Sequence, residues 1–122
     1  MKGMLFLIAV SSAIALACAT ALETGRPFVI VRNAKKAGYG TGKLIEGRLE
    51  RGERVLLVED IATSGGQAVE AIRTLREAGA VVNDIVVTID RQEGARAAIE
   101  AADVRFHALF TSQDLGITPS PM

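Results

Sequence analysis

The residues best suited to chemistry lie in the stretch Val55–Gly66, which reads VLLVEDIATSGG. A short apolar run ends in two adjacent carboxylates, Glu59 and Asp60, and the turn Thr63–Gly66, rich in hydroxyls and glycine, follows. Two like charges at the end of a buried strand repel each other and lose solvation, so they need partners such as sugar hydroxyls or a Mg²⁺-bound water. The stretch therefore joins a site for hydroxyls or a metal to a site for a phosphate, a combination that matches a ribose 5-phosphate.

The turn Thr63–Gly66 leads into a helical pattern, so its backbone N–H groups stand at a helix N-terminus. Glycines let such groups approach an anion, hydroxyls add donors, and the helix dipole favours negative charge. Taken alone, the turn would be an ordinary N-cap, because Thr and Ser are common in that position. The carboxylates directly before it favour the phosphate site.

The elements that must position these residues alternate between strands and helices. Buried strands are expected at residues 4–10, 28–32, 55–58, 85–89 and 105–110, with helices after residue 12 and over 67–78 and 93–102. This alternation predicts an α/β fold, a Rossmann-like parallel β-sheet flanked by helices on both faces. Such sheets bind ligands at the carboxyl ends of their strands, where Arg32, Glu59-Asp60 and Asp90-Arg91 all fall.

Length, charge and cysteine content restrict the class of protein. The 122 residues predict one domain, 1–122, ending in a tail at 117–122, and the 49% hydrophobic content allows an aliphatic core. Fourteen basic and fourteen acidic residues cancel, which gives no general argument for binding nucleic acid or a membrane surface. The single Cys18 excludes an intramolecular disulfide and fits a reducing, cytoplasmic compartment.

The N-terminal residues 4–21 are almost free of charge and have two interpretations. They resemble a signal peptide, and they are about long enough for a short membrane span. We favour a first strand and helix of the domain, because the apolar run splits at Ser11-Ser12, Gly25 is a helix stop, and Pro27 begins a β-rich run. The targeting segment is the alternative.

The stretch Val55–Gln67 resembles the phosphoribosyl pyrophosphate signature of type I phosphoribosyltransferases, in which four apolar residues precede two acids, two further residues and a glycine-rich loop. Two other segments are similar to the orotate phosphoribosyltransferases of that family. Arg32–Lys43 resembles their mobile catalytic loop, and Asp90–Gly94 resembles the segment whose arginine contacts the orotate carboxylate. The resemblance implies transfer of phosphoribosyl from phosphoribosyl pyrophosphate to orotate, which yields orotidine 5′-phosphate and pyrophosphate in pyrimidine biosynthesis.

The resemblance also implies a role for each site residue. Binding of phosphoribosyl pyrophosphate falls to Arg32, Asn33, Lys36, Tyr39, Glu59, Asp60, Ile61, Ala62, Thr63, Ser64, Gly65, Gly66 and Gln67. Catalysis falls to Lys36 or Lys35 and to Asp60, and orotate binding to Thr63 and Arg91. Mg²⁺ would be held through the ligand near Glu59 and Asp60, with no direct protein ligand. The loop lysine acts across a dimer in the family, so a homodimer is implied.

Physical chemistry offers plain alternatives for the basic residues. An arginine beyond a strand end can hold a carboxylate bidentately, but Arg91 can also pair with Glu93 or Asp90. Lysines of a closing loop can neutralise pyrophosphate, but they can equally form a solvated basic loop. We expect residues 33–54 to form a mobile basic loop and a hairpin. Lys35 and Lys36 compete for the catalytic position, and counting from Arg32 favours Lys36.

The chain departs from the family pattern on the pyrophosphate side. Val10–Ala13 reads VSSA where the family has a glycine pair, which argues against a backbone nest there, and Asn33 stands in place of a lysine. The N-terminal hood of full-length members has no counterpart in this sequence. Three hypotheses follow: an active orotate phosphoribosyltransferase-like enzyme, a non-catalytic or regulatory module that binds a phosphoribosyl ligand, and a truncated fragment.

Overall fold

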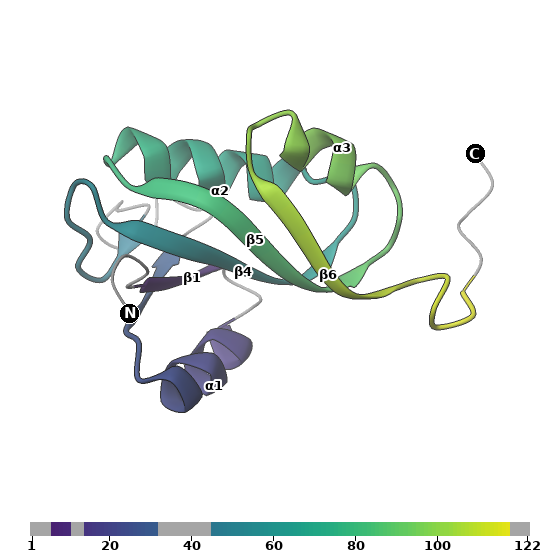
Figure 1. Ribbon diagram of the computed structural model, residues 1–122, viewed down its shortest axis with the longest axis horizontal. Helices are drawn as coiled ribbons and strands as arrows, with labels where there is room; N and C mark the ends of the chain where they lie inside the picture. Colours follow the sequence, from purple (N-terminus) through teal and green to yellow (C-terminus); the bar gives the residue numbers. More distant parts are fainter. Residues whose placement is uncertain (1–5, 11–13, 32–44, 118–122) are drawn as a thin grey trace.

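The computed structural model describes residues 6–10, 14–31 and 45–117 (Figure 1). Six strands form one sheet in the order β3-β2-β1-β4-β5-β6, and neighbouring strands are parallel except β3, which is antiparallel to β2. In chain order the elements are β1 (Phe6–Val10), α1 (Ile14–Thr24), β2 (Phe28–Val31), β3 (Ile45–Glu46), β4 (Arg54–Ala62), α2 (Gly66–Glu77), β5 (Val81–Asp90), α3 (Ala95–Glu100) and β6 (Arg105–Thr111).

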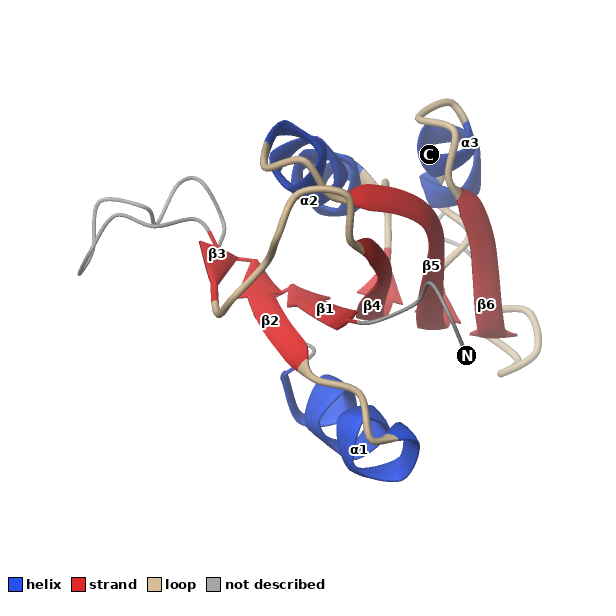
Figure 2. Ribbon diagram, turned by 60° about the vertical axis from the view of Figure 1, so that its left-hand side comes forward, coloured by secondary structure: helices blue, strands red, loops and turns tan. Residues whose placement is uncertain are grey.

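The helices lie on both faces of the sheet, as the sequence predicts. Helices α2 and α3 cover one face and α1 lies against the other (Figures 1 and 2). The main core fills the space beneath α2 and α3, where its largest fully buried side chains are Leu57, Ile72, Leu75, Ile85 and Ile99. Each such side chain contributes about 1.5–3 kcal/mol through removal from water. This core fixes the sheet on which the candidate site is built.

Several elements begin or end at residues that differ from the expected ones. Strand β4 continues past Val58 to Ala62, and β5 begins at Val81 instead of Ile85. The two strands extend together, with Glu59 opposite Val87 and Ala62 opposite Asp90, so pairing decides their length more than local composition does. Both carboxylates of the Glu59-Asp60 pair therefore lie within a strand and not after it.

The N-terminal β-α unit is present as expected. Strand β1 lies between β2 and β4, and α1 ends at Thr24. Gly25 follows in the left-handed conformation, at φ 71°, and its N–H donates to the carbonyl oxygen of Ala21 over 2.8 Å. Within the described parts of the chain, no helix is long and apolar enough to cross a membrane.

Candidate functional site

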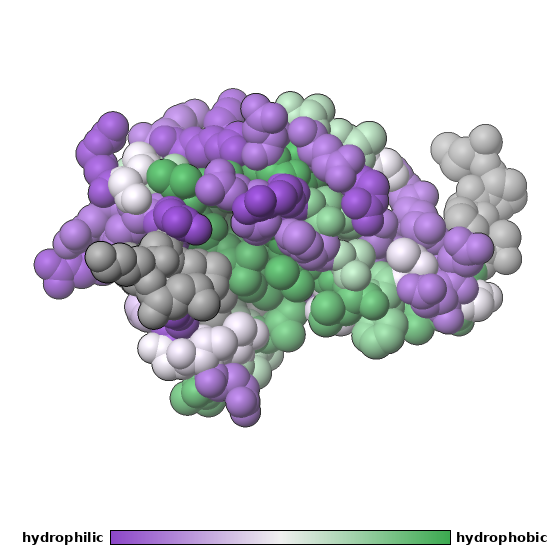
Figure 3. Space-filling view, in the orientation of Figure 1, coloured by the Kyte–Doolittle hydropathy of each residue, from purple (hydrophilic) through white to green (hydrophobic). Residues whose placement is uncertain are grey.

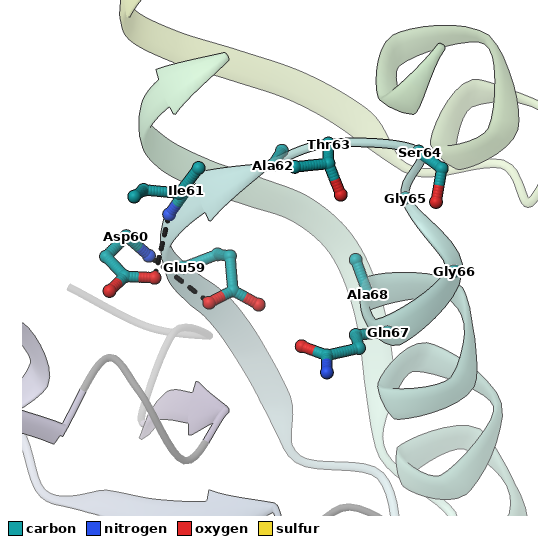
Figure 4. Close-up of a pocket in the computed structure, with 10 residues that line it drawn as sticks. All are labelled: Glu59, Asp60, Ile61, Ala62, Thr63, Ser64, Gly65, Gly66, Gln67 and Ala68. Carbon is teal, nitrogen blue, oxygen red and sulfur yellow. Dashed lines mark hydrogen bonds between the residues drawn. The ribbon is translucent and has the colours of Figure 1, made fainter. Parts of the chain in front are cut away.

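The strand order reverses between β1 and β4. The chain leaves β1 toward β2 on one side of the sheet, whereas β4 leads to β5 and β6 on the other side. A crevice outside the carboxyl ends of two such strands is the usual ligand position in open parallel sheets. The end of β4 carries a pocket of about 400 Å³, lined by residues 59–68 (Figure 4). It brings together all nine predicted residues from Glu59 to Gln67 and adds Ala68.

Gly65 is the N-cap of α2, and two constraints require glycine there. Its φ is 90°, a left-handed value, and a Cβ atom would lie 3.1 Å from the Cα of Ala95 and 3.3 Å from the Cβ of Ala98. The absence of a side chain therefore lets the start of α2 pack directly against α3.

The start of α2 offers backbone donors to the pocket. The first hydrogen bond of the helix runs from the N–H of Val69 to the carbonyl oxygen of Gly65, over 2.9 Å. The N–H groups of residues 66–68 therefore lie before the first helical hydrogen bond. The sequence alone allowed Thr63 or Ser64 as the N-cap of this helix. In the structure the N-cap is Gly65, and no side chain makes a capping hydrogen bond. Both hydroxyls lie on the same side of the loop (Figure 4). This arrangement suits an anion at a helix N-terminus.

The two carboxylates diverge from adjacent positions of β4 (Figure 4). Side chains alternate along a strand, so Glu59 and Asp60 leave β4 in different directions, and both line the pocket. Glu59 is buried at 4% exposure, and its Oε1 accepts the N–H of Asp60 at 3.3 Å. The half-buried Asp60 accepts the N–H of Ile61 through Oδ1 at 2.7 Å.

The acidic residues of the pocket can be compared with what a metal ion requires. No three His, Cys, Asp or Glu side chains come together among residues 6–10, 14–31 and 45–117. The oxygen donors of Glu59 and Asp60 are nevertheless of the kind that Mg²⁺ prefers, and Mg²⁺ keeps several waters and substrate oxygens in its shell. The residues present therefore fit a metal that is held mainly by its ligand.

Arg91 lies at the carboxyl end of β5, beside the pocket loop. Its backbone N–H donates to the carbonyl oxygen of Ala62 over 2.9 Å, and the N–H of Ala95 donates to that of Thr63 over 3.1 Å. The Arg91 side chain pairs with Glu93, with 3.0 Å between Nε and Oε2, and the two side chains are 53% and 38% exposed. The ion pair weighed from the sequence is therefore formed. An exposed pair is worth about 0–1 kcal/mol, so a ligand carboxylate can displace Glu93.

The site residues predicted at the start of the basic loop lie outside the described residues. These are Arg32, Asn33, Lys35, Lys36 and Tyr39, and Ser11–Ala13 of the predicted pyrophosphate loop are outside as well. Strand β3 pairs with β2 at the edge of the sheet (Figure 2). In the described part of residues 33–54, the segment expected to form a loop and a hairpin, the strand before β4 is β3, which has two residues and pairs with β2.

Two residues that hold the loop after β5, Gln92 and Ser112, are not among the predicted site residues. Ser112 directly follows β6 and is 3% exposed. A polar residue directly after a strand is the same sequence signal that indicated Arg91, so this signal indicates Ser112 as well. Gln92 carries no such signal, because its backbone conformation, at φ 61°, is visible only in the structure.

Comparison with known proteins identifies the family. The model of the phosphoribosyl transferase domain matches residues 2–113. The chain belongs to the phosphoribosyl transferase domain family. The fold and the resemblance to type I phosphoribosyltransferases, closest to the orotate enzymes, are thereby confirmed.

Individual phosphoribosyltransferases give the same result. The chain is 50% identical over 103 residues to orotate phosphoribosyltransferase of Natronomonas pharaonis, covering 84% of this chain and 59% of that protein. It is 48% identical over 103 residues to the enzyme of the same name from Pyrococcus furiosus, covering 84% and 56%. The crystal structure of Mycobacterium tuberculosis orotate phosphoribosyltransferase in complex with 5-phospho-α-D-ribosyl 1-diphosphate matches with a TM-score of 0.76 and 32% identity, over 92% of this chain and 65% of that one. The chain thus spans less than two thirds of each of these three proteins.

Proposed function

We propose that this protein transfers phosphoribosyl from phosphoribosyl pyrophosphate to orotate, which yields orotidine 5′-phosphate and pyrophosphate. The observation that carries the proposal is the pocket at the end of β4, where two carboxylates and a glycine-capped helix N-terminus line one cavity of about 400 Å³. The 50% identity to a named orotate phosphoribosyltransferase supports orotate as the acceptor.

The geometry supports a division of the pocket into two halves. The 5-phosphate binds the first backbone N–H groups of α2, Gly66 to Ala68, with the hydroxyls of Thr63 and Ser64 as further donors. Glu59 and Asp60 hold the ribose 2- and 3-hydroxyls. The bond from the anomeric carbon to pyrophosphate breaks as the bond to the base forms, and the carboxylates stabilise the positive charge that develops on the ring.

Mg²⁺ is the proposed cofactor, held through the pyrophosphate and the ribose hydroxyls near Glu59 and Asp60. When bound, it neutralises charge on the leaving group. Lys36, or Lys35 in its place, supplies a further positive charge, and Arg32, Asn33 and Tyr39 contact the pyrophosphate. We also propose a cytoplasmic homodimer that shares the basic loop across its interface. The lone Cys18 supports the reducing compartment.

On the base side, Arg91 binds the orotate carboxylate and Thr63 contacts the base. Support comes from the position of Arg91, one strand away from the phosphate loop and joined to it by the bond to Ala62. An arginine fork matches a planar carboxylate better than any other side chain does.

A second candidate is a module that binds a phosphoribosyl ligand without turnover. The sequence VSSA at Val10–Ala13 favours it, because a leaving pyrophosphate would lack the backbone nest that glycines provide. The ribose-phosphate half of the site is unaffected by this change. The two candidates therefore differ in chemistry and not in the first ligand they bind.

One titration separates the candidates. The purified protein is titrated with phosphoribosyl pyrophosphate and Mg²⁺, with and without orotate, while pyrophosphate release is followed. Release that depends on orotate is the expected result. Binding without release at any protein concentration would leave the module, and no binding at all would remove both candidates and favour a fragment.

A further inference from the structure

The loop that follows β5 is held from two sides. On one side, the N–H groups of Arg91 and Ala95 donate to the carbonyl oxygens of Ala62, at the end of β4, and of Thr63, in the turn that follows. On the other side, the turn that follows β6 contacts the same loop through Ser112. The position of Arg91 therefore depends on residues outside the pocket.

Ser112 makes the main connection on the β6 side. It is 3% exposed, and its N–H donates to the carbonyl oxygen of Asp90 over 2.9 Å. Its hydroxyl donates to the carbonyl oxygen of Arg91 at 3.0 Å, and the side-chain oxygen of Gln92 is a second acceptor at 3.2 Å. A buried hydroxyl that binds the carbonyl of Arg91 itself restrains the backbone from which the arginine side chain extends.

Gln92 completes the connection from the other direction. Its N–H donates to Oδ1 of the buried Asp90 over 2.9 Å, and its Oε1 accepts the N–H of Gln113 over 3.0 Å. Its φ of 61° lies in the left-handed region, where a side chain is strained. Such a conformation persists only where surrounding contacts determine it, and these hydrogen bonds supply that determination.

We propose that Ser112 and Gln92 are positioning residues for the base side of the site. Neither lines the pocket, and both act through the backbone of Arg91. The inference rests on the proposed function in one respect, that the ligand of Arg91 is the carboxylate of orotate. It predicts that changes at these positions affect the base and spare the ribose phosphate.

The variants are Ser112→Ala, which removes only the hydroxyl, and Gln92→Met, which keeps the length of the side chain without the amide. Ser112→Thr restores a hydroxyl and serves as the rescue. Asp114→Ala is the matched control, because the Asp114 side chain stabilises the same turn by accepting the N–H of Thr111 at 2.8 Å and forms no hydrogen bond with residues 91–94 in the described part of the chain. Each full-length variant is measured for orotate and phosphoribosyl pyrophosphate binding by calorimetry and for amide hydrogen exchange.

For Ser112→Ala and Gln92→Met we expect about tenfold weaker orotate binding, with affinity for phosphoribosyl pyrophosphate within about twofold. Amide exchange at Arg91 should rise in both, and Ser112→Thr and Asp114→Ala should resemble the parent. Equal losses for both ligands, or unchanged exchange at Arg91, would overturn the positioning role. If the parent binds no orotate, the proposed function fails, and the exchange of the Arg91 amide still decides whether Ser112 and Gln92 hold this backbone.

Discussion

The backbone N–H of Arg91 donates to the carbonyl oxygen of Ala62 across 2.9 Å. This bond joins the loop after β5 to the last residue of β4, so the proposed base-binding arginine is connected through the backbone to the strand that leads into the proposed phosphate site. Since neither partner uses its side chain, substitution of either residue leaves the bond available. The two halves of the site can therefore be tested separately by changing side chains.

Arg91 and Glu93 provide the test of the base side. Arg91→Gln should weaken orotate binding by about tenfold or more, because a charge-assisted hydrogen bond to a carboxylate is lost. Glu93→Gln should leave orotate binding unchanged or tighten it, because the exposed competitor of Arg91 is removed. Calorimetry with orotate measures both. Equal weakening by the two substitutions would contradict the assignment of Arg91.

Gly65 tests the packing of the phosphate loop. Gly65→Ala should lower the free energy of unfolding by about 1–3 kcal/mol, because the residue is left-handed and its new Cβ would meet Ala95 at 3.1 Å. Gly94→Ala is the matched control, since Gly94 is also a left-handed N-cap, at φ 109°, with nothing within 4 Å of its Cβ position. Urea denaturation should show the larger loss at Gly65. Equal losses would mean that the close approach of α2 and α3 contributes nothing.

The loss of unfolding free energy at low pH should depend on Asp84. Hydrogen bonds from Arg105, at 2.8 Å, outweigh partial burial and hold the pKa of Asp84 below its ordinary value of 3.8, with a smaller contribution from His107. A lowered carboxyl pKa stabilises the fold above the unfolded value, and that contribution is lost as the pH falls through the folded value. Unfolding free energies measured between about pH 5 and pH 2 should fall more steeply in the parent than in Asp84→Asn. Asp103→Asn is the control variant. If its unfolding free energy fell with pH along the same slope as that of Asp84→Asn, the result would contradict this account.

The two lysines of the basic loop, Lys35 and Lys36, test how the loop contributes to turnover. Lys36→Ala should reduce pyrophosphate release while sparing the binding of phosphoribosyl pyrophosphate, because the proposed role of this lysine is to neutralise charge on the leaving group. Lys35→Ala is the companion variant and should have the smaller effect on release. The reverse order would assign the role to Lys35.

Much of the fold could be predicted from the sequence, because buried parallel strands and their helices leave strong patterns. The continuous apolar runs of β1, β2 and β4 and the stripe formed by Val69, Ile72 and Leu75 on α2 all indicated the correct element. The strand ends were less accurate. Strands β4 and β5 lengthen each other by pairing, and a partner strand is not visible in the local sequence.

The candidate site also has one part that the sequence predicts and one part that it does not. The residues of the pocket are consecutive, so a local motif was enough to select Glu59 to Gln67. The support for Arg91 depends on bonds between residues about twenty or more positions apart, such as Ser112 with Arg91. Neither the left-handed Gln92 nor the use of Gly65 as the cap follows from composition, because both depend on packing between separate elements.

The most direct test of the account is the affinity of phosphoribosyl pyrophosphate, with Mg²⁺, for the parent, for Asp60→Asn and for the control Asp114→Asn. We predict saturable binding by the parent and by Asp114→Asn, and binding weaker by about tenfold or more in Asp60→Asn, because we propose that this carboxylate holds the ribose hydroxyls. Calorimetric titration gives all three constants. Unchanged affinity in Asp60→Asn would contradict the placement of the ribose-phosphate site at the end of β4.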